Sequence, residues 1–270
     1  MKELNGIVSV VAAAFCLATS MPGALGAEAN LDVYANSKYL WRGQMLNDEP
    51  VVQPGLTATA SNGLSFNVWG NYNLTDARSE TTDRKFDEVD LTASYAVPIE
   101  DLNLEVGIMQ YLFPHQGSVQ ASTAANGSTI PALKFPDTRE VYVSAGLNSI
   151  LKPTAKVYYD FDQVEGFYGV ASISHGIRLT ESMTTDLTLS LGAADSDYNS
   201  YYFGVNEDAL NDGDATLSLS YELNKAWSFG GYVQYARLLD GRIREAANTA
   251  SGYFNHDDMV VCGVHAKYDF

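Results

Sequence analysis

The side chains best suited to acyl-transfer chemistry in this sequence are a neighbouring serine and histidine, Ser174 and His175. A serine nucleophile needs a histidine within hydrogen-bond reach as its general base. On one β-strand this requires a spacing of two, because adjacent side chains point to opposite faces. His265 has no serine two residues away, and His115 and His256 fall in segments expected to be loops. The sequence therefore indicates no catalytic residue, and a lipid-modifying hydrolase is the function class that it favours least.

Two acidic stretches have some of the features of a cation site. Residues 208–214 (Asp-Ala-Leu-Asn-Asp-Gly-Asp) are spaced like a calcium loop, but Leu210 stands where an oxygen ligand is needed. His256, Asp257 and Asp258 form a short run that is more typical of a solvated loop. The sequence also contains no thiol pair and no glycine-rich phosphate loop. We therefore expect no metal and no cofactor.

The elements that must position the remaining charged residues are predicted to be strands, and the last one is the clearest. In residues 259–270 one face carries Val264, Tyr268 and Phe270 among other apolar residues, and the opposite face is more polar. Period-two alternation is typical of a strand. An apolar face that ends in a terminal Phe resembles the closing strand of a bacterial outer-membrane barrel. We expect the barrel-assembly machinery to recognise this strand.

About twelve segments alternate in this way, each close to the roughly 9–11 residues of a tilted spanning strand. The clearest lie at residues 102–109, 140–147, 187–193, 215–223 and 227–235. Noisier ones lie at residues 31–42, 51–60, 64–74, 87–97, 155–161 and 167–177.

The connections between these segments alternate in length. Short ones lie at residues 61–63, 98–101, 148–153, 178–185 and 224–226, and long polar ones at 44–50, 75–85, 114–138, 195–213 and 239–257. Residues 162–166 are short where a long connection is expected. Tight turns on one rim and long loops on the other are typical of outer-membrane barrels, and an even strand number places both chain ends on the periplasmic rim.

The first 27 residues are expected to be a cleaved signal peptide, which leaves residues 28–270 as the barrel domain. Lys2 supplies a basic start, residues 6–21 are apolar, and residues 22–27 offer small residues for cleavage. The apolar run is too short for the roughly 20 residues of a transmembrane helix. Cleavage leaves Cys262 as the single thiol, so no internal disulfide is expected in the exported chain.

Charge and hydropathy fit one barrel domain of about 243 residues. The formal net charge is −17, which argues against nucleic acid as a partner because phosphate binding needs clustered Lys and Arg. The mean hydropathy of −0.12 is near neutral, as it is when alternating strands average out.

Aromatic residues favour a membrane barrel over a soluble sandwich or a lipocalin-like barrel, which share the alternation. Tyr and Trp prefer the membrane interface because one end of the side chain is apolar and the other polar. The aromatics expected at the interface with outer-membrane lipid are Tyr39, Trp41, Trp227, Tyr268 and Phe270. The opposite faces carry mainly small Ser, Thr and Gly, whereas a soluble barrel would present charged residues to water.

If the apolar faces contact lipid, the polar faces line the lumen. The residues expected to line the pore are Arg42, Glu88, Asp90, Glu105, Glu140, Asp160, Glu222 and Lys267, with Asp32, Lys38, Lys156, Asp162 and Asp269 as further candidates. Burying unpaired charges costs several kcal/mol each, so the lumen holds either water or ion pairs. An acid excess of roughly two to one would concentrate cations in a water-filled lumen. Alternatively, Arg42 and the lysines pair with the acids and plug the interior.

Residues 37–43 (Ser-Lys-Tyr-Leu-Trp-Arg-Gly) resemble the opening motif of the TorF family of bacterial porins, Ser-Asp-Tyr-x-x-Arg-Gly. The resemblance continues at residues 50–55, 68–71, 88–91, 107–114 and 140–142, and spans roughly residues 31–175. Lys38 replaces the usual acid, which puts in question any ion pair that the family forms with Arg42. The resemblance implies an outer-membrane barrel with a transport role and no agreed substrate.

The sequence thus predicts an all-β protein, a transmembrane antiparallel up-and-down barrel of about twelve strands in a Gram-negative outer membrane. The predicted function is passive diffusion of small hydrophilic solutes or ions, with a weak cation preference set by Glu88, Asp90, Glu105, Glu140 and Asp160. The alternative is a non-conducting barrel whose long loops bind a partner outside the cell. An inward fold of residues 114–138, which would narrow the pore, is a further option.

Overall fold

The computed structural model describes residues 28–75, 84–114, 122–123, 129–130, 136–248 and 256–270. The expected signal peptide at residues 1–27 lies outside the described residues. Most of the connection at residues 114–138 also does, so the option of its inward fold stays a prediction.

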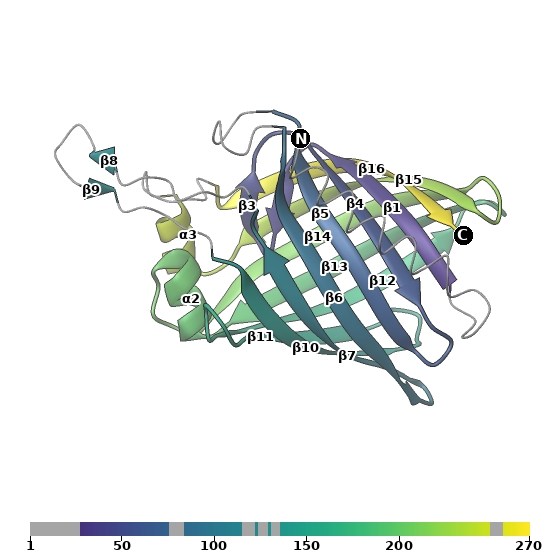
Figure 1. The fold of residues 1–270 in the computed structure, drawn as a ribbon, viewed down its shortest axis with the longest axis horizontal. Coiled ribbons are helices and arrows are strands. Elements are labelled where there is room, and N and C mark those ends of the chain that lie inside the picture. The colour runs from purple at the N-terminus through teal and green to yellow at the C-terminus, as the bar shows by residue number, and fades with distance from the viewer. Residues whose placement is uncertain (1–27, 76–83, 115–121, 124–128, 131–135, 249–255) are drawn as a thin grey trace.

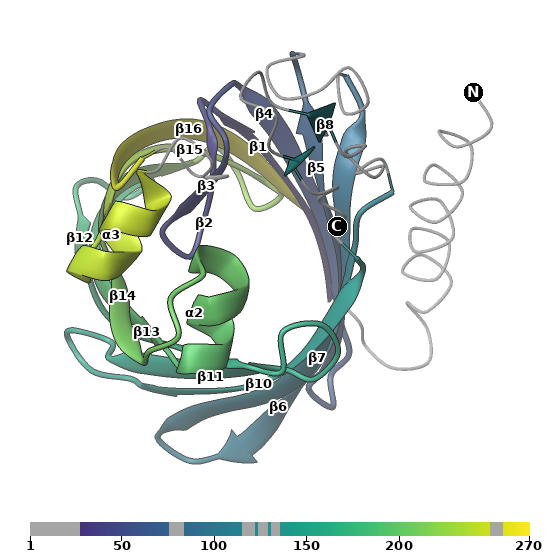
Figure 2. The ribbon, with the colours of Figure 1, turned by 90° about the vertical axis from the view of Figure 1, so that its left-hand side faces the viewer.

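Twelve antiparallel strands form a closed barrel, as the sequence predicts (Figures 1 and 2). Each strand pairs with its neighbours in chain order, and pairing of the first with the last closes the sheet. The strands are β1 (Glu28–Asn36), β4 (Val51–Thr59), β5 (Leu64–Asn73), β6 (Phe86–Ile99), β7 (Leu102–Leu112), β10 (Thr138–Leu147), β11 (Thr154–Asp160), β12 (Phe167–Arg178), β13 (Met183–Ala194), β14 (Ala209–Glu222), β15 (Trp227–Leu238) and β16 (Asp258–Asp269).

The alternating pattern places apolar side chains on the outside of the wall. On β13, Leu187, Leu189 and Leu191 point outward and are 49%, 43% and 52% exposed, while the intervening Ser and Thr point inward. A soluble barrel buries its apolar face inside instead. This inversion is the arrangement of a barrel surrounded by lipid.

The connections divide the barrel into two rims. One rim, here called the turn rim, has the short connections at residues 60–63, 100–101, 148–153, 179–182 and 223–226, and the other, the loop rim, has those at 37–50, 74–85, 113–137, 161–166, 195–208 and 239–257. The first and last strands begin and end at the turn rim, where the Phe270 N–H donates to the Ala29 carbonyl at 3.0 Å. The predicted alternation of connection lengths is confirmed, including the short exception at the loop rim.

The structure corrects one expected strand, residues 31–42. β1 ends at Asn36, and β2 (Tyr39–Trp41) and β3 (Gln44–Asn47) form a separate two-stranded hairpin. Arg42 and Gly43 connect them with φ of 46° and 72°. Two successive positive φ values define the type I′ turn, whose twist matches that of a tight hairpin. The chain therefore turns back at Arg42 instead of continuing along the wall.

Two short helices lie at the loop rim. α2 (Ser196–Phe203) is capped by the Asp195 side chain, and α3 (Gly241–Ala247) by that of Asp240. Viewed from this end, α2 and the β2–β3 hairpin lie inside the outline of the barrel (Figure 2). β8 (Ser122–Thr123) and β9 (Thr129–Ile130) pair with each other away from the wall (Figure 1). Neither described helix has the length and apolar character needed to cross a membrane.

Candidate functional site

The β2–β3 hairpin, here called the luminal hairpin, crosses the barrel interior near the loop rim. It leaves the wall between β1 and β4, and its tip reaches strands on the opposite side. A Cβ built on Gly43 would lie 2.6 Å from Cβ of Asp212 on β14 and 3.0 Å from Leu238 on β15. Glycine is favoured at this position, because the turn needs a positive φ and the side chains of Asp212 and Leu238 leave no room for a Cβ.

At the tip, Arg42 forms a bidentate ion pair with Glu140 on β10. Its two terminal nitrogens lie 2.8 and 2.6 Å from the carboxylate oxygens, and the two side chains are only 8% and 3% exposed. The Tyr111 hydroxyl on β7 donates to the same carboxylate at 2.7 Å. Bidentate arginine–carboxylate pairs are among the stronger and more geometrically specific polar contacts. This pair therefore fixes the hairpin tip against the wall.

Aromatic rings surround the guanidinium group. Arg42 Cζ lies 4.5 Å from the ring centroid of Trp41, 4.1 Å from that of Tyr158 and 4.7 Å from that of Tyr168. Ring faces attract a cation through their quadrupole, more strongly when the site is desolvated. The rings and Glu140 together hold the positive charge away from water.

Helix α2 covers the hairpin from the loop side. The Gln44 side-chain amide donates to the Tyr198 hydroxyl at 3.1 Å, and the Tyr202 ring lies 5.5 Å from that of Trp41. Burial raises the pKa of Tyr198, so its hydroxyl stays protonated. The hairpin and α2 therefore form one packed unit that narrows the lumen. We call this unit, with the wall residues that it contacts, the constriction.

A chain of side-chain amides holds the base of the hairpin to the wall. Asn36 donates to Gln53 at 2.7 Å, and Gln53 donates to Asn71 at 2.9 Å. Asn47 on β3 joins this chain by donating to Asn73 at 2.7 Å. All of these side chains are buried, and buried polar networks whose members are bonded tend to specify one conformation.

Four further carboxylates are buried in the wall at this level: Glu88, Asp90, Asp160 and Asp212. The hydroxyl of Tyr39 bonds to Glu88, and that of Tyr168 donates to Asp212 at 3.0 Å. One oxygen of Asp90 is buried without a partner among the described residues. The constriction therefore has more buried acids than buried cations.

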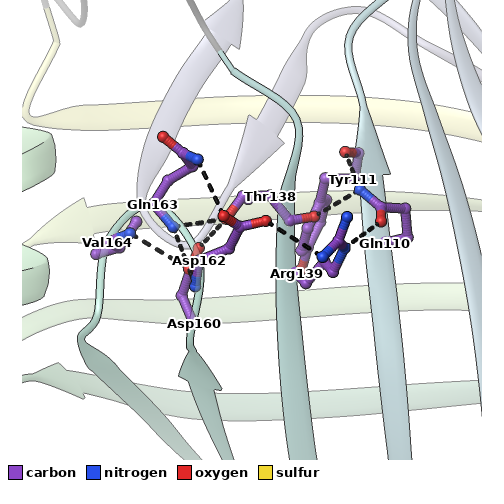
Figure 3. A network of polar contacts seen from close by, with 8 residues as sticks. All are labelled: Gln110, Tyr111, Thr138, Arg139, Asp160, Asp162, Gln163 and Val164. Atoms are coloured by element: carbon purple, nitrogen blue, oxygen red, sulfur yellow. Dashed lines mark hydrogen bonds and ion pairs between the residues drawn. The ribbon is translucent and has the colours of Figure 1, made fainter.

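Asp160 has a different role from the other acids (Figure 3). One carboxylate oxygen accepts from the backbone N–H groups of residues 162–164 at 2.9–3.2 Å, and the other accepts from the Thr138 hydroxyl at 2.6 Å. Asp160 thus organises the short connection at residues 161–166. On the outer side of the same strands, Arg139 donates to Gln110 at 2.7 Å and lies 3.8 Å from Asp162.

The structure divides the predicted pore residues into two groups. Arg42, Glu88, Asp90, Glu140 and Asp160 come together at the constriction. The other three lie nearer the turn rim: Glu105 accepts from the Tyr142 hydroxyl at 2.7 Å, Lys267 pairs with Asp269 at 2.7 Å, and Glu222 ends its strand. Asp162 lies in a loop rather than on a wall strand, and Lys38 lies between β1 and β2.

The expected interface aromatics also fall into two groups. Trp227, Tyr268 and Phe270 lie together on the outer wall at the turn rim, with ring centroids 4.8 and 5.0 Å apart. Tyr39 and Trp41 are instead on the luminal hairpin, and Tyr39 is only 7% exposed. Their expected position at the lipid interface is wrong, because the chain leaves the wall after Asn36.

Five residues of this site are not among those predicted from the sequence: Tyr111, Tyr158, Tyr168, Tyr198 and Asp212. A usable signal existed for the hairpin itself. Residues 39–41 (Tyr-Leu-Trp) and 44–46 (Gln-Met-Leu) are two mainly apolar runs separated by the dipeptide Arg-Gly, and a glycine-containing two-residue link between such runs predicts a hairpin.

The candidate chemical motifs do not assemble into a reactive site. His175 Nδ1 lies 3.0 Å from the Ile150 carbonyl, and Ser174 is paired with Thr188 on the inner face. Most of the calcium-like run at residues 208–214 lies in β14. Among the residues that the structure describes, no three His, Cys, Asp or Glu side chains are grouped for metal binding.

Sequence comparison assigns the chain to a family. A bacterial family described as "Bacterial protein of unknown function (Gcw_chp)" matches residues 22–233. The chain belongs to this family. That description does not contain the TorF name, so the TorF relationship remains a prediction. No curated protein matches the chain.

Two solved structures with a similar fold are described as porins. A structure described as "KdgM porin" has 12% sequence identity and a TM-score of 0.51, and covers 89% of this chain and 99% of its own. A second, "KdgM porin in complex with disordered oligogalacturonate", has the same identity and coverage with a TM-score of 0.52. At 12% identity, these two comparisons show that this Gcw_chp protein shares the barrel fold of the KdgM porin.

Proposed function

We propose that this protein is an outer-membrane channel for passive diffusion of small hydrophilic solutes, with a weak preference for cations. The lipid-facing outer wall and the porin fold support this location. In this orientation the turn rim faces the periplasm, the loop rim faces outside, and residues 1–27 are removed on export. Assembly would proceed through β16 and its terminal Phe270, which the barrel-assembly machinery would recognise.

The acid excess at the constriction is the observation that carries the proposal. Glu88, Asp90, Glu140, Asp160 and Asp212 are buried there, whereas Arg42 is the one buried cationic side chain at this level among the described residues. Glu140 offsets Arg42, and Asp160 accepts from backbone N–H groups of residues 162–164, so Glu88, Asp90 and Asp212 in their ionised forms set the sign of the local field. Low-dielectric walls focus such a field and raise the local concentration of counter-ions.

The comparison with KdgM sharpens the expected selectivity. That porin was solved with oligogalacturonate, which is a polyanion. A lumen whose constriction has excess carboxylates would repel a polyanion at close range. We therefore infer that this chain takes neutral or cationic solutes and not acidic sugars.

A second function is supported by the same hairpin. The luminal hairpin and α2 are joined to the wall by ion-paired, aromatic and amide contacts, and such a unit would also suit a plug. In that case the barrel does not conduct, and its long loops bind a partner outside the cell. A lipid-modifying hydrolase has less support, because Ser174 and His175 have other partners.

Uptake by proteoliposomes tests the proposal. We expect lysine to enter faster than the neutral sugar arabinose, and arabinose faster than glutamate. Replacing Glu88→Gln and Asp90→Asn together should reduce the ratio of lysine to glutamate uptake several-fold. Glu105→Gln, which removes a charge outside the constriction, is the matched control and should change it less.

Two outcomes would contradict the proposal in different ways. Equal uptake of lysine and glutamate by the unmodified chain would overturn the cation preference. A folded, inserted barrel that admits none of the three solutes would overturn the channel and favour the plugged barrel.

A further inference from the structure

An apolar groove runs across the outside of the barrel wall from the loop rim towards the turn rim. Its volume is about 1000 Å³, at the upper end of the roughly 300–1,000 Å³ range of ligand pockets. The lining is almost entirely apolar, and Arg237 is its one cationic residue. The luminal constriction faces the other side of the wall, so the groove is a separate feature.

A row of small outward-facing residues forms the floor of this groove. Ala145, Ala155 and Ala171 are directly opposed on β10, β11 and β12, and the row continues through Leu191 to Gly213. Direct cross-strand partners share a face of the sheet, so the three alanines form a shallow floor, and the Leu191 side chain, which is 52% exposed, stands between this floor and Gly213. A Cβ built on Gly213 would lie 3.4 Å from the side chains of Leu191 and Leu239, so these two leucines border the groove at its loop-rim end.

Larger side chains stand beside this floor. The neighbouring row contains Ile173, Leu189 and Tyr235, which are 40%, 43% and 42% exposed. Spanning strands tilt by roughly 35–45°, so a row perpendicular to them crosses the bilayer obliquely. The groove therefore runs obliquely through the lipid-facing surface, where acyl chains contact the wall.

Arg237 lies at the end of the groove next to the loop rim. It is the register partner of Gly213, one residue before the end of β15, and it is exposed. Asp258 is directly opposite it on β16, but the two form no ion pair, and the described residues give its guanidinium no hydrogen-bond partner. The other outward-facing cation on a wall strand near this rim, Arg139, is engaged by Gln110 and Asp162.

We propose that this groove binds one molecule of lipid A, the phosphorylated glycolipid anchor of the outer leaflet. Arg237 contacts a phosphate, and one acyl chain passes beside Leu191 and lies over the floor formed by Ala171, Ala155 and Ala145. Arginine is suited to this role because its planar fork matches phosphate oxygens. The choice of lipid A rests on the proposed orientation, in which the loop rim lies in the outer leaflet.

Native mass spectrometry of the refolded, detergent-solubilised chain tests the proposal. We expect one lipid A to be retained, and phosphatidylcholine and phosphatidylglycerol to bind more weakly. Arg237→Gln should lower the apparent affinity for lipid A roughly tenfold, as expected when a charge-assisted contact of about 1.4 kcal/mol is lost. Ala171→Phe fills the floor and should lower it similarly.

Matched controls separate the groove from the general surface. Arg139→Gln removes the other outward cation at the loop rim, and Leu217→Phe enlarges an exposed outer-wall residue outside the groove. Both should bind lipid A like the unmodified chain. Equal affinity in the groove variants and the controls would overturn the proposal, as would binding of phosphatidylglycerol as tight as that of lipid A. A dimer that Ala171→Phe abolishes without added lipid would replace lipid A with a second copy of the chain.

Solute uptake, measured beside lipid A binding, distinguishes this proposal from the proposed channel. Ala171 faces outward, so Ala171→Phe should leave solute uptake unchanged. A chain that retains lipid A but admits no solute would contradict the channel alone. A chain that admits solutes, with lipid A binding unaffected by either groove variant, would contradict the groove alone.

Discussion

The two halves of the lumen, one near the loop rim and one near the turn rim, are enclosed by the same strands but differ in what lies inside them. In the half near the loop rim, inward side chains such as Asn71, Glu88, Glu140 and Asp212 are buried under the luminal hairpin and α2. In the half near the turn rim, inward positions carry small hydroxyl side chains such as Ser174 and Ser218, which stay partly exposed. The strands continue through both halves, so the wall does not cause this difference.

The difference lies in one connection of the chain. The turn-rim connections return to the next strand at once, whereas residues 37–50 enter the lumen and bring Arg42 to the opposite wall. Burial then makes each polar group in the upper half costly unless it is bonded. We conclude that the wall provides a tube and that the luminal hairpin determines what passes through it.

Removing the luminal hairpin should have the largest effect, because it would make the two halves alike. Asn36 and Val51 are register partners, so an Asn-Gly turn in place of residues 37–50 can close β1 onto β4. Single-channel conductance in a planar bilayer should rise several-fold, and cation preference should increase because the counter-charge is lost. The same turn in place of residues 180–182 at the turn rim, where the Leu179 N–H donates to the Met183 carbonyl, is the control. An unchanged conductance in the hairpin-replaced chain would show that the hairpin does not limit flow.

Breaking the Arg42 ion pair should have the next largest effect, on stability. Arg42→Gln leaves Glu140 as an uncompensated buried charge, and losing one partner of a buried pair costs about 3–5 kcal/mol. Glu140→Gln should also destabilise, and the double variant should lose less than the sum, since the two residues are coupled. Urea unfolding in detergent measures these losses.

Lys156→Gln, in the half of the lumen near the turn rim, is the control for the ion-pair variants. Lys156 lies 3.7 Å from the Tyr142 ring centroid, so its replacement should cost about 1 kcal/mol or less. Strict additivity of Arg42→Gln and Glu140→Gln would contradict the contact between them.

Replacing two buried acids of the constriction one at a time should separate its effect on stability from its effect on ion preference. Asp160→Asn weakens the acceptor for the N–H groups of residues 162–164 and should cost about 1–3 kcal/mol, with little change in ion preference. Asp90→Asn should lower cation preference at little cost in stability, because one of its oxygens has no partner among the described residues. Reversal potentials and urea unfolding, measured on both variants, check this. A loss of cation preference in Asp160→Asn, with little loss of stability, would show that Asp160 faces the ions.

Alanine substitution at two glycines, compared by the loss of stability, should give the smallest and most specific effect. Gly43→Ala must adopt a positive φ of 72° and also place its Cβ against Asp212, whereas Gly204→Ala has a similar φ of 68° with no heavy atom within 4 Å. The backbone cost of about 1–2 kcal/mol is common to both. Any further loss in Gly43→Ala reports its contact with Asp212 on β14, and equal losses would argue against that contact.

The barrel itself was predictable from the sequence because each strand carries its own signal. Alternation at residues 187–193 or 227–235 needs no distant partner, and the turn-rim connections are short enough to recognise directly. The acids Glu88, Asp90 and Glu140 were found for the same reason, since their parity places them on the inner face.

The constriction was not predictable in the same way, because it depends on contacts between distant residues. Arg42 and Glu140 are 98 residues apart in the chain. Residues 37–43 continue the alternation of β1, so parity alone extended that strand and placed Tyr39 and Trp41 in the lipid interface. The Arg-Gly turn was the local signal that outweighs the alternation.

A salt-gradient recording of the unmodified mature chain in a planar bilayer tests the central claim most directly. The acidic constriction predicts discrete, small conductance steps with a reversal potential shifted towards that of a cation-selective channel. A shift towards anions would show that Arg42 and the lysines control the constriction. Insertion without any conductance would show that the luminal hairpin closes the barrel, and either result would contradict this account.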